Sequence, residues 1–140
     1  MLVEDIMIRN VVCADPDISI RDAAKMMTDN HIGGIVLKKD GNVVGLVTDR
    51  NLLEALAEEK EDEKVSDIMA RYVISIGPEA TVEHATEIMI KNKIKRLPVM
   101  KGEKLVGILT STDIVAASPS VPREMKSLVK RGFARMMKRN

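Results

Sequence analysis

Aromatic side chains are almost absent from this chain of 140 residues. It contains no tryptophan, one tyrosine (Tyr72) and one phenylalanine (Phe133). Proteins that bind single-stranded nucleic acid usually stack the bases on aromatic rings, and this sequence offers no such platform. Cysteine is equally scarce, because Cys13 is the only one. A lone cysteine excludes an internal disulfide and fits a reducing compartment.

Long apolar runs are also missing. No stretch approaches the roughly 20 apolar residues that cross a bilayer, so we expect no transmembrane segment. The first five residues, Met-Leu-Val-Glu-Asp, are acidic at their end and lack the layout of a signal peptide. Together these absences predict a cytoplasmic protein.

The motifs of the common enzyme classes are lacking as well. His31 and His84 are isolated, and the segment around His84 is not a zinc-binding helix motif. There is no Gly-x-Ser-x-Gly elbow and no Gly-x-x-x-x-Gly-Lys phosphate loop. Cys13 lies in an apolar run, where a packed side chain is the simpler interpretation. We therefore expect no catalytic site, no metal site and no enzyme activity.

What the chain does contain is a duplication. A shift of 62 positions lays Val3–Leu56 over Val65–Ser118 without a gap. Identical residues recur along the overlap, such as Asp5-Ile6-Met7 over Asp67-Ile68-Met69, Val44-Gly45 over Val106-Gly107, and Thr48 over Thr110. A repeat of this length indicates a duplicated structural unit. A unit of about 55 residues is marginal alone, so we expect the two copies to form one cooperative module.

Each copy predicts the order strand, helix, strand, strand, helix. In the first copy, Ser19 is placed as a helix N-cap with an acidic residue three positions on. Gly33-Gly34 is expected to end that helix. Asp40-Gly41 then predicts a tight hairpin between two apolar runs.

The second copy repeats the plan. Val73–Ile76 predicts a strand, and Thr81 an N-cap. Pro98 lacks a backbone donor, so we expect it at a strand edge or at the start of a ladder.

At these motifs the sequence resembles a tandem cystathionine-β-synthase (CBS) domain pair, or Bateman module. The resemblance is carried by Val65–Met69, Ile94–Val99 and Gly107–Ile114. Their counterparts in the first copy are Val3–Met7, Ile32–Val36 and Gly45–Leu52. It implies an α/β (α+β) fold of two β-α-β-β-α units related by a pseudo-two-fold axis.

The corresponding division of the chain is a first CBS motif at 3–56, a charged linker at 57–64, a second motif at 65–118 and a tail at 119–140. The resemblance further implies an adenine nucleotide bound between the halves, a homodimer, and regulation of a partner protein. AMP, ADP and ATP are the expected ligands, with NAD and S-adenosylmethionine as further candidates. No cofactor is required.

The best candidate for a ligand contact is Asp113, because a carboxylate can accept both hydroxyl protons of a ribose. Thr110, three residues earlier, can bond ribose or phosphate. The same Thr-x-x-Asp spacing is a helix capping box, so both interpretations stay open and Asp113 can serve in both roles. Lys95 and Arg96 are candidate phosphate contacts, with a solvated basic pair as the alternative.

Apolar residues are expected to hold the base. By resemblance these are Val73 and Ile74, with Tyr72 nearby, closed by Ile94, Leu97 and Pro98. Ordinary core packing is the alternative for each of them.

The first copy departs from the pattern. Asn51 stands in place of Asp113, and Gly33-Gly34 in place of Lys95-Arg96. We therefore expect the site at Thr48 and Asn51 to be weaker, empty or used for something else.

The tail lies outside the repeat and is strongly basic, with seven basic residues and one acidic residue in 119–140. An apolar stripe at helical spacing predicts an amphipathic helix; it consists of Met125, Leu128, Val129, Phe133, Met136 and Met137. Packing on its own module or across a dimer is one interpretation. Docking to a partner or anionic surface and binding to nucleic acid are the others.

Overall fold

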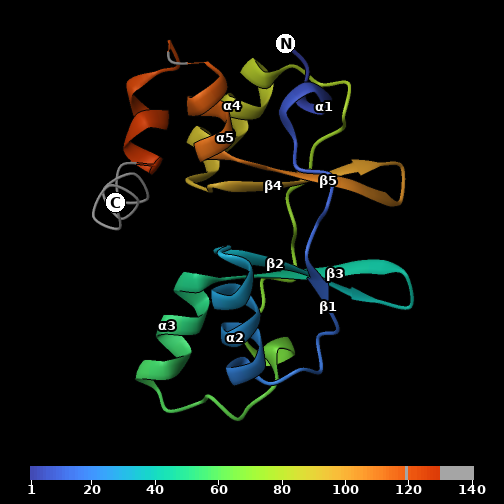
Figure 1. Ribbon diagram of the computed structural model, residues 1–140, viewed down its shortest axis with the longest axis vertical. Coiled ribbons are helices and arrows are strands. Elements are labelled where there is room, and N and C mark those ends of the chain that lie inside the picture. Colours follow the sequence, from blue (N-terminus) through green and yellow to red (C-terminus); the bar gives the residue numbers. More distant parts are fainter. Residues whose placement is uncertain (119, 130–140) are drawn as a thin grey trace. The chain divides into compact units, whose positions relative to one another are not determined.

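The computed structural model describes residues 1–118 and 120–129. These residues form two compact units whose boundaries differ from those of the two sequence copies (Figure 1). The middle unit runs from Val11 to Val73. The terminal unit joins Met1–Asn10 to the chain from Ile74 onward. Each unit therefore takes its opening segment from the other copy, which the sequence repeat alone does not reveal.

The middle unit holds a three-stranded sheet with the order β1-β2-β3. Its elements are β1 (Cys13–Ala14), α2 (Ile20–Asn30), β2 (Gly34–Lys39), β3 (Asn42–Thr48), α3 (Asp49–Ala57) and the 3-10 turn η1 (Val65–Asp67). Strand β1 is parallel to β2, and β2 is antiparallel to β3. At the other edge of β3, Leu46 and Ala70 exchange two backbone hydrogen bonds of 3.0 and 2.9 Å. That pairing ties the start of the second sequence copy to this sheet.

The terminal unit repeats this arrangement. Its elements are α1 (Val3–Ile6), α4 (Val82–Asn92), β4 (Arg96–Lys101), β5 (Lys104–Thr110) and α5 (Ser111–Ala117), and residues 123–129 are helical. Strands β4 and β5 are antiparallel. Ile8 and Ile108 exchange hydrogen bonds of 2.9 Å each, 62 positions from the Ala70–Leu46 pair. The two units thus have the same register, including the same bulge after Leu37 and Val99.

The predicted helix starts are confirmed. The Ser19 hydroxyl accepts from the backbone N–H of Asp22 at 3.0 Å, and Thr81 accepts from His84 at 3.1 Å. The prediction that Gly33-Gly34 ends α2 is wrong, because α2 ends at Asn30 and His31 adopts the left-handed conformation with φ 54°. His31 donates its N–H to the helix carbonyls, which satisfies the last turn before the glycines are reached.

The hairpin prediction is confirmed at Asp40 and Gly41, whose φ angles of 52° and 81° match a type I′ turn. Strand β2 ends immediately before this pair, and β3 begins immediately after it.

Pro98 explains why the predicted strand Val73–Ile76 is reduced to a single bridge at Ile76. In the middle unit Val36 donates its N–H to Val12 at 3.3 Å, and that bond extends the parallel pairing of β1 with β2. Pro98 occupies the equivalent position and has no N–H to donate, so only Ile76 pairs, with its own N–H reaching the Pro98 carbonyl at 3.1 Å.

Two glycines make room for the exchanged segments. A Cβ on Gly107 would lie 2.6 Å from the Met7 sulfur and 3.1 Å from the Ile8 carbonyl oxygen. A Cβ on Gly45 would lie 2.5 Å from the Met69 sulfur and 3.0 Å from the Ala70 carbonyl. Because glycine has no side chain, a methionine from the other sequence copy can pack directly against the strand in each unit.

Each unit has its own hydrophobic core. In the middle unit the core comprises Ile20, Ala23, Met27, Ile35, Leu37, Val47, Leu52, Ala55 and Val65. In the terminal unit it includes Val82, Ala85, Met89, Leu97, Leu109, Ile114 and Met125. Met125 comes from the tail, so the tail contributes to the core of its own unit at this point. The rest of the predicted stripe, Phe133, Met136 and Met137, lies outside the described residues. Of the helices in the described ranges, none is long and apolar enough to span a bilayer.

Candidate functional site

Thr110 and Asp113 form a capping box at the start of α5. The Thr110 hydroxyl donates to Asp113 Oδ2 at 2.6 Å, and the Thr110 backbone N–H reaches the same oxygen at 3.2 Å. In return the Asp113 backbone N–H donates to Thr110 Oγ1 at 3.2 Å. The Thr-x-x-Asp spacing therefore forms a helix capping box, as one of its two interpretations predicted.

The capping box leaves half of the carboxylate available. A carboxylate offers about four acceptor positions on its two oxygens, and the box uses two of them, both on Oδ2. Asp113 is half-buried, and its two bonds from Thr110 fix the position of the carboxylate. Because Thr110 already donates its only hydroxyl proton, Thr110 can act toward a ligand only as an acceptor while the box is closed.

The equivalent box in the middle unit offers opposite chemistry. The Thr48 backbone N–H and hydroxyl both donate to Asn51 Oδ1, at 2.9 and 3.0 Å. A backbone N–H can only donate, so the amide must turn its oxygen inward and its NH₂ outward. Asn51 therefore presents donors at the position where Asp113 presents an acceptor.

The basic candidates lie next to the Thr110–Asp113 box. Arg96 pairs with Thr110 across β4 and β5, and the Ser111 N–H donates to the Lys95 carbonyl at 2.8 Å. Lys95 is exposed and Arg96 is half-buried. In the middle unit Gly34 pairs with Thr48 in the same way, without any side chain to contribute charge.

Three apolar candidates belong to the same unit but differ in their surroundings. Leu97 is fully buried in the core, and Pro98 is buried on β4. Ile94 is half-buried and packs against that core. Of the three, Ile94 is the one whose side chain is partly exposed to solvent.

The remaining apolar candidates fall on the boundary between the units. Ile74 begins the main part of the terminal unit and packs against its core. Val73 and Tyr72 end the middle unit, and the Tyr72 side chain is 89% exposed. The structure thus brings Ile74, Ile94, Lys95, Arg96, Leu97, Pro98, Thr110 and Asp113 into one unit, and assigns Tyr72, Val73, Thr48 and Asn51 to the other.

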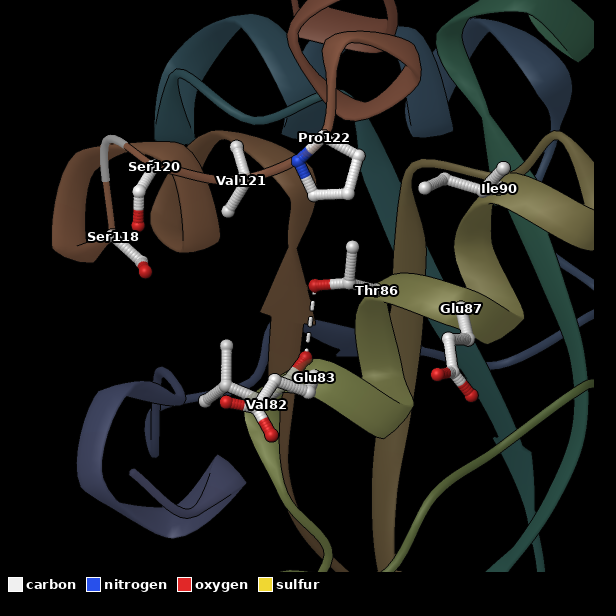
Figure 2. Close-up of a pocket in the computed structure, with 9 residues that line it drawn as sticks. All are labelled: Val82, Glu83, Thr86, Glu87, Ile90, Ser118, Ser120, Val121 and Pro122. Atoms are coloured by element: carbon white, nitrogen blue, oxygen red, sulfur yellow. Dashed lines mark hydrogen bonds between the residues drawn. The ribbon is translucent and has the colours of Figure 1, made fainter.

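A groove that the sequence did not suggest lies on the terminal unit (Figure 2). It measures about 310 Å³ and runs between α4 and the chain that follows α5; it is lined by Val82, Glu83, Thr86, Glu87, Ile90, Ser118, Ser120, Val121 and Pro122. The Thr86 hydroxyl in its wall donates to the Val82 carbonyl at 2.8 Å, so that hydroxyl is satisfied within α4. Residues 82, 86 and 90 follow helical spacing, and this row was the sequence signal that could have indicated the groove. None of the predicted ligand residues lines this groove.

Other reactive side chains are dispersed. Within residues 1–118 and 120–129 no three His, Cys, Asp or Glu side chains gather as metal ligands would. His84 Nδ1 lies 3.9 Å from a Glu87 oxygen on the surface of α4. Burial raises the pKa of the Cys13 thiol, and the nearby Lys38 charge opposes that shift only in part. Cys13 is therefore a poor nucleophile at neutral pH.

A family model described as the CBS domain matches the chain twice, at residues 3–58 and 65–120. The chain belongs to the CBS domain family. The resemblance seen in the sequence is thus confirmed, together with the mixed α+β fold of two CBS repeats.

Curated relatives of this CBS pair include both large enzymes and small proteins. Inosine-5′-monophosphate dehydrogenase of Thermoplasma acidophilum is 34% identical over 134 residues, which is 94% of this chain but 27% of the enzyme. The chain thus spans about a quarter of that relative, and the match is to its CBS part. The CBS domain-containing protein YhcV of Bacillus subtilis is 31% identical, over 80% of this chain and 81% of that protein.

Solved structures show the same fold. The CBS domain pair of protein MJ0100, in complex with 5′-methylthioadenosine and S-adenosyl-L-methionine, is 33% identical with a TM-score of 0.79, over 84% of this chain and 94% of that one. CBSX2 in complex with AMP is 27% identical with a TM-score of 0.73, over 84% and 96% of the two chains. CBS pairs similar to this one are therefore known with adenosine-containing ligands.

Proposed function

We propose that this CBS pair is a regulatory module that binds an adenine nucleotide and transmits its occupancy to a partner protein. AMP, ADP and ATP are the first candidates, and S-adenosylmethionine and NAD share the same adenosine group. Similar structures with AMP and with S-adenosyl-L-methionine support the ligand class. The module itself carries out no reaction, so the bound nucleotide is recovered unchanged.

The proposal depends on how the Asp113 carboxylate is hydrogen-bonded. Its Oδ2 is held by Thr110, which orients the carboxylate, while the box leaves the acceptor positions of Oδ1 for a ligand. A ribose presents two neighbouring hydroxyl donors, and hydrogen bonds to a charged acceptor are the strong kind. Lys95, immediately before β4, and Arg96, the first residue of β4, add positive charge beside this position, as a phosphate requires.

The Thr48–Asn51 site offers a ribose poorer hydrogen bonding than the Thr110–Asp113 site. Asn51 turns NH₂ outward, and two donors cannot bond each other, so a ribose hydroxyl can bond Asn51 only by reversing its role and accepting. Gly33 and Gly34 supply no cation. The Thr48–Asn51 site therefore binds an adenine nucleotide more weakly than the Thr110–Asp113 site, or not at all.

A reciprocal exchange of the two residues tests the proposal. Asp113→Asn removes the charge while the middle unit shows that Asn can close the same box, so the fold should persist. Losing a hydrogen bond to a charged group costs about 1.5–3 kcal/mol, which predicts affinity for AMP, ADP or ATP lowered roughly 10- to 150-fold in titration calorimetry. Asn51→Asp should strengthen binding at the other site.

The matched control is Asp22→Asn, which removes a carboxylate from the first turn of α2, away from either box. It should leave affinity unchanged. If Asp113→Asn binds all three nucleotides like the parent protein, or if Asp22→Asn weakens binding equally, Asp113 does not hold the ligand.

A further inference from the structure

Helix α5 joins the Thr110–Asp113 box to the tail of the chain. It has seven residues, against nine in its twin α3 of the middle unit. Its buried residues, Ser111 and Ile114, both lie in the first half, and its last turn ends in the exposed Ala116 and Ala117. A helix this short is not stable in water by itself, because its first turn costs more than the few later hydrogen bonds return. The groups that hold its two ends therefore influence whether it is fully formed.

The first end of α5 is held by the same groups that are proposed to meet a ribose. The hydroxyl and the N–H of Thr110 both donate to Asp113 Oδ2, and Asp113 returns its own N–H to the Thr110 hydroxyl oxygen. These bonds need residue 113 in the first helical turn, three positions after the cap. A ligand that bonds the Asp113 carboxylate in this position therefore binds the formed helix and stabilises it.

The second end of α5 is continued by the tail. Ser118 stands before Pro119 in the sequence, a position that disfavours the helical conformation, and α5 stops there with Ser118 at φ −143°. The Ser118 N–H still donates to the Ile114 carbonyl at 2.8 Å, and the Ser118 carbonyl accepts from the Val121 N–H at 3.2 Å. These two bonds connect the last turn of α5 to the start of the tail.

Beyond this point the chain forms a short helix at residues 123–129, which we call the tail helix. In its first turn the Met125 N–H donates to the Pro122 carbonyl at 3.0 Å. Met125 is completely buried in the core that also holds Ile114 of α5, and Val129 is 3% exposed. The tail helix and α5 therefore share one hydrophobic core.

Few side chains hold the tail helix in place. The groove of about 310 Å³ lies between α4 and the chain that leads into the tail helix, so Ser120 and Pro122 border a cavity on that side (Figure 2). Met125 and Val129 are the buried anchors of the tail helix, and Leu128 is partly buried. A segment with so few buried side chains opens at a lower free energy than the strands and helices of a core.

A ligand and the tail helix thus stabilise the same short helix from its two ends. A ligand on Asp113 favours the formed α5, and the formed α5 supports the tail helix. By thermodynamic linkage, the docked tail helix then raises the affinity for the ligand by the same factor. The middle unit lacks this arrangement, because its chain returns from α3 to the start of α2, where the Ile20 N–H donates to the Glu63 carbonyl at 2.9 Å.

We propose that the tail helix is the element that reports nucleotide occupancy. A nucleotide on Asp113 holds residues 123–129 on the core, and its departure releases them. Release exposes Met125 and Val129, which gives a partner protein an apolar surface that is present in only one of the two states. The inference rests on the regulatory function proposed above, for which it names the element that changes.

Hydrogen exchange on the full-length protein tests the coupling from the ligand to the tail helix. With AMP, ADP or ATP at about 100 times its Kd, exchange in residues 123–129 can slow by up to roughly 100-fold, and we expect at least about tenfold. Unchanged exchange in the tail helix, in a protein whose α5 becomes protected by the same nucleotide, would overturn the proposal.

Two matched variants test the coupling without nucleotide. Thr110→Ala removes the hydroxyl from the box at α5, and Thr48→Ala removes its counterpart at α3. Thr110→Ala should speed exchange in the tail helix by about 2- to 30-fold, which is the effect of losing an N-cap on the stability of a helix. Thr48→Ala should leave that exchange unchanged. Equal exchange rates in the two variants would contradict the coupling.

Met125→Asp tests the reverse direction, because a carboxylate is excluded from the core and the tail helix must leave it. The nucleotide affinity in titration calorimetry should fall at least about tenfold, in line with the slowing of exchange. Ser127→Asp adds the same charge to the exposed side of the tail helix and is the matched control, with unchanged affinity. Exchange in β4 and β5 shows whether the Met125→Asp unit is folded; if it is not, the comparison of Thr110→Ala with Thr48→Ala decides.

The outcomes separate this inference from the proposed function. If nucleotide binds and Asp113→Asn weakens binding, but Met125→Asp binds as tightly as Ser127→Asp, the site exists and the tail helix does not report its occupancy. If no nucleotide binds while Thr110→Ala still speeds exchange in the tail helix, the box and the tail helix are coupled and the proposed ligand is wrong.

Discussion

Gly107→Ala probes the exchange of opening segments between the two sequence copies. The added methyl group would meet the Met7 sulfur at 2.6 Å, the Met7 Cγ at 3.0 Å and the Ile8 carbonyl oxygen at 3.1 Å. The end of a methionine side chain can move, but the Ile8 carbonyl is held by its 2.9 Å hydrogen bond from Ile108. The backbone of the opening segment must therefore shift if alanine is to fit.

The magnitude follows from two opposing effects. Overpacking of this kind costs about 1–3 kcal/mol. Alanine also restricts the unfolded chain relative to glycine, which returns about 0.4–1 kcal/mol. We expect a net destabilisation of about 1–2 kcal/mol, or roughly 3–8 °C in Tm for a chain of this size. Urea denaturation followed by circular dichroism measures it.

Gly77→Ala is the matched control, because its Cβ would find only the Met100 carbonyl oxygen, at 4.0 Å. Its stability should equal that of the parent or rise by up to about 1 kcal/mol, since the effect on the unfolded chain is unopposed there. Combining Gly107→Ala with Met7→Ala should cost less than the sum of the two single changes, by about 0.5 kcal/mol or more, since the smaller side chain vacates the contested space. Equal stability of the Gly107→Ala and Gly77→Ala proteins would refute the close approach of Met7 to β5.

Three further outcomes follow from single side chains. Thr81→Ala removes the hydroxyl that accepts from His84 and should cost about 0.5–2 kcal/mol in urea denaturation, whereas Thr81→Ser should cost far less. Met125→Ala, at a completely buried position, should cost about 2–5 kcal/mol; a cost below 0.5 kcal/mol would mean that the tail does not join the core. Burial raises the pKa of the Cys13 thiol, so its alkylation should be slow at pH 7 and accelerate only above the ordinary thiol pKa. The raised pKa also links stability to pH. Its contribution to the free energy of unfolding is complete below the thiol pKa of the unfolded chain and is lost as pH rises through the thiol pKa of the folded protein. Alkylation at pH 7 as fast as that of a free thiol would contradict it.

Local features were predictable where a single residue type has a specific backbone requirement. Ser19 and Thr81 cap helices because a hydroxyl placed before a helix accepts a free N–H, and that chemistry needs only neighbours in sequence. Asp40-Gly41 forms its turn because both residues tolerate positive φ. The strand predicted at Val73–Ile76 was largely wrong because its hydrogen-bond partner, Pro98, is more than twenty residues away.

Some features of the candidate site were likewise predictable from sequence, and others were not. The types and spacing of Thr110 and Asp113 were sufficient to name them as a pair with two possible roles. Which oxygen stays available, and the outward NH₂ of Asn51, depend on hydrogen-bond geometry that no spacing encodes. The groove beside α4 and the exposure of Leu53 on α3 depend on where the chain goes after each helix pair, which differs between the two copies.

By itself the sequence determined the duplication, the family, the order of elements and the residue types available to a ligand, because all of these are encoded in local patterns repeated 62 residues apart. Only the tertiary structure decided that each unit completes its sheet with a segment of the other copy and that Gly45 and Gly107 make room for it. It also decided that Met125 packs into the core of the terminal unit, while Leu53 and Leu56 are exposed among the described residues. Those outcomes rest on contacts between residues distant in sequence, whose packing and hydrogen bonds exist only once the chain has folded.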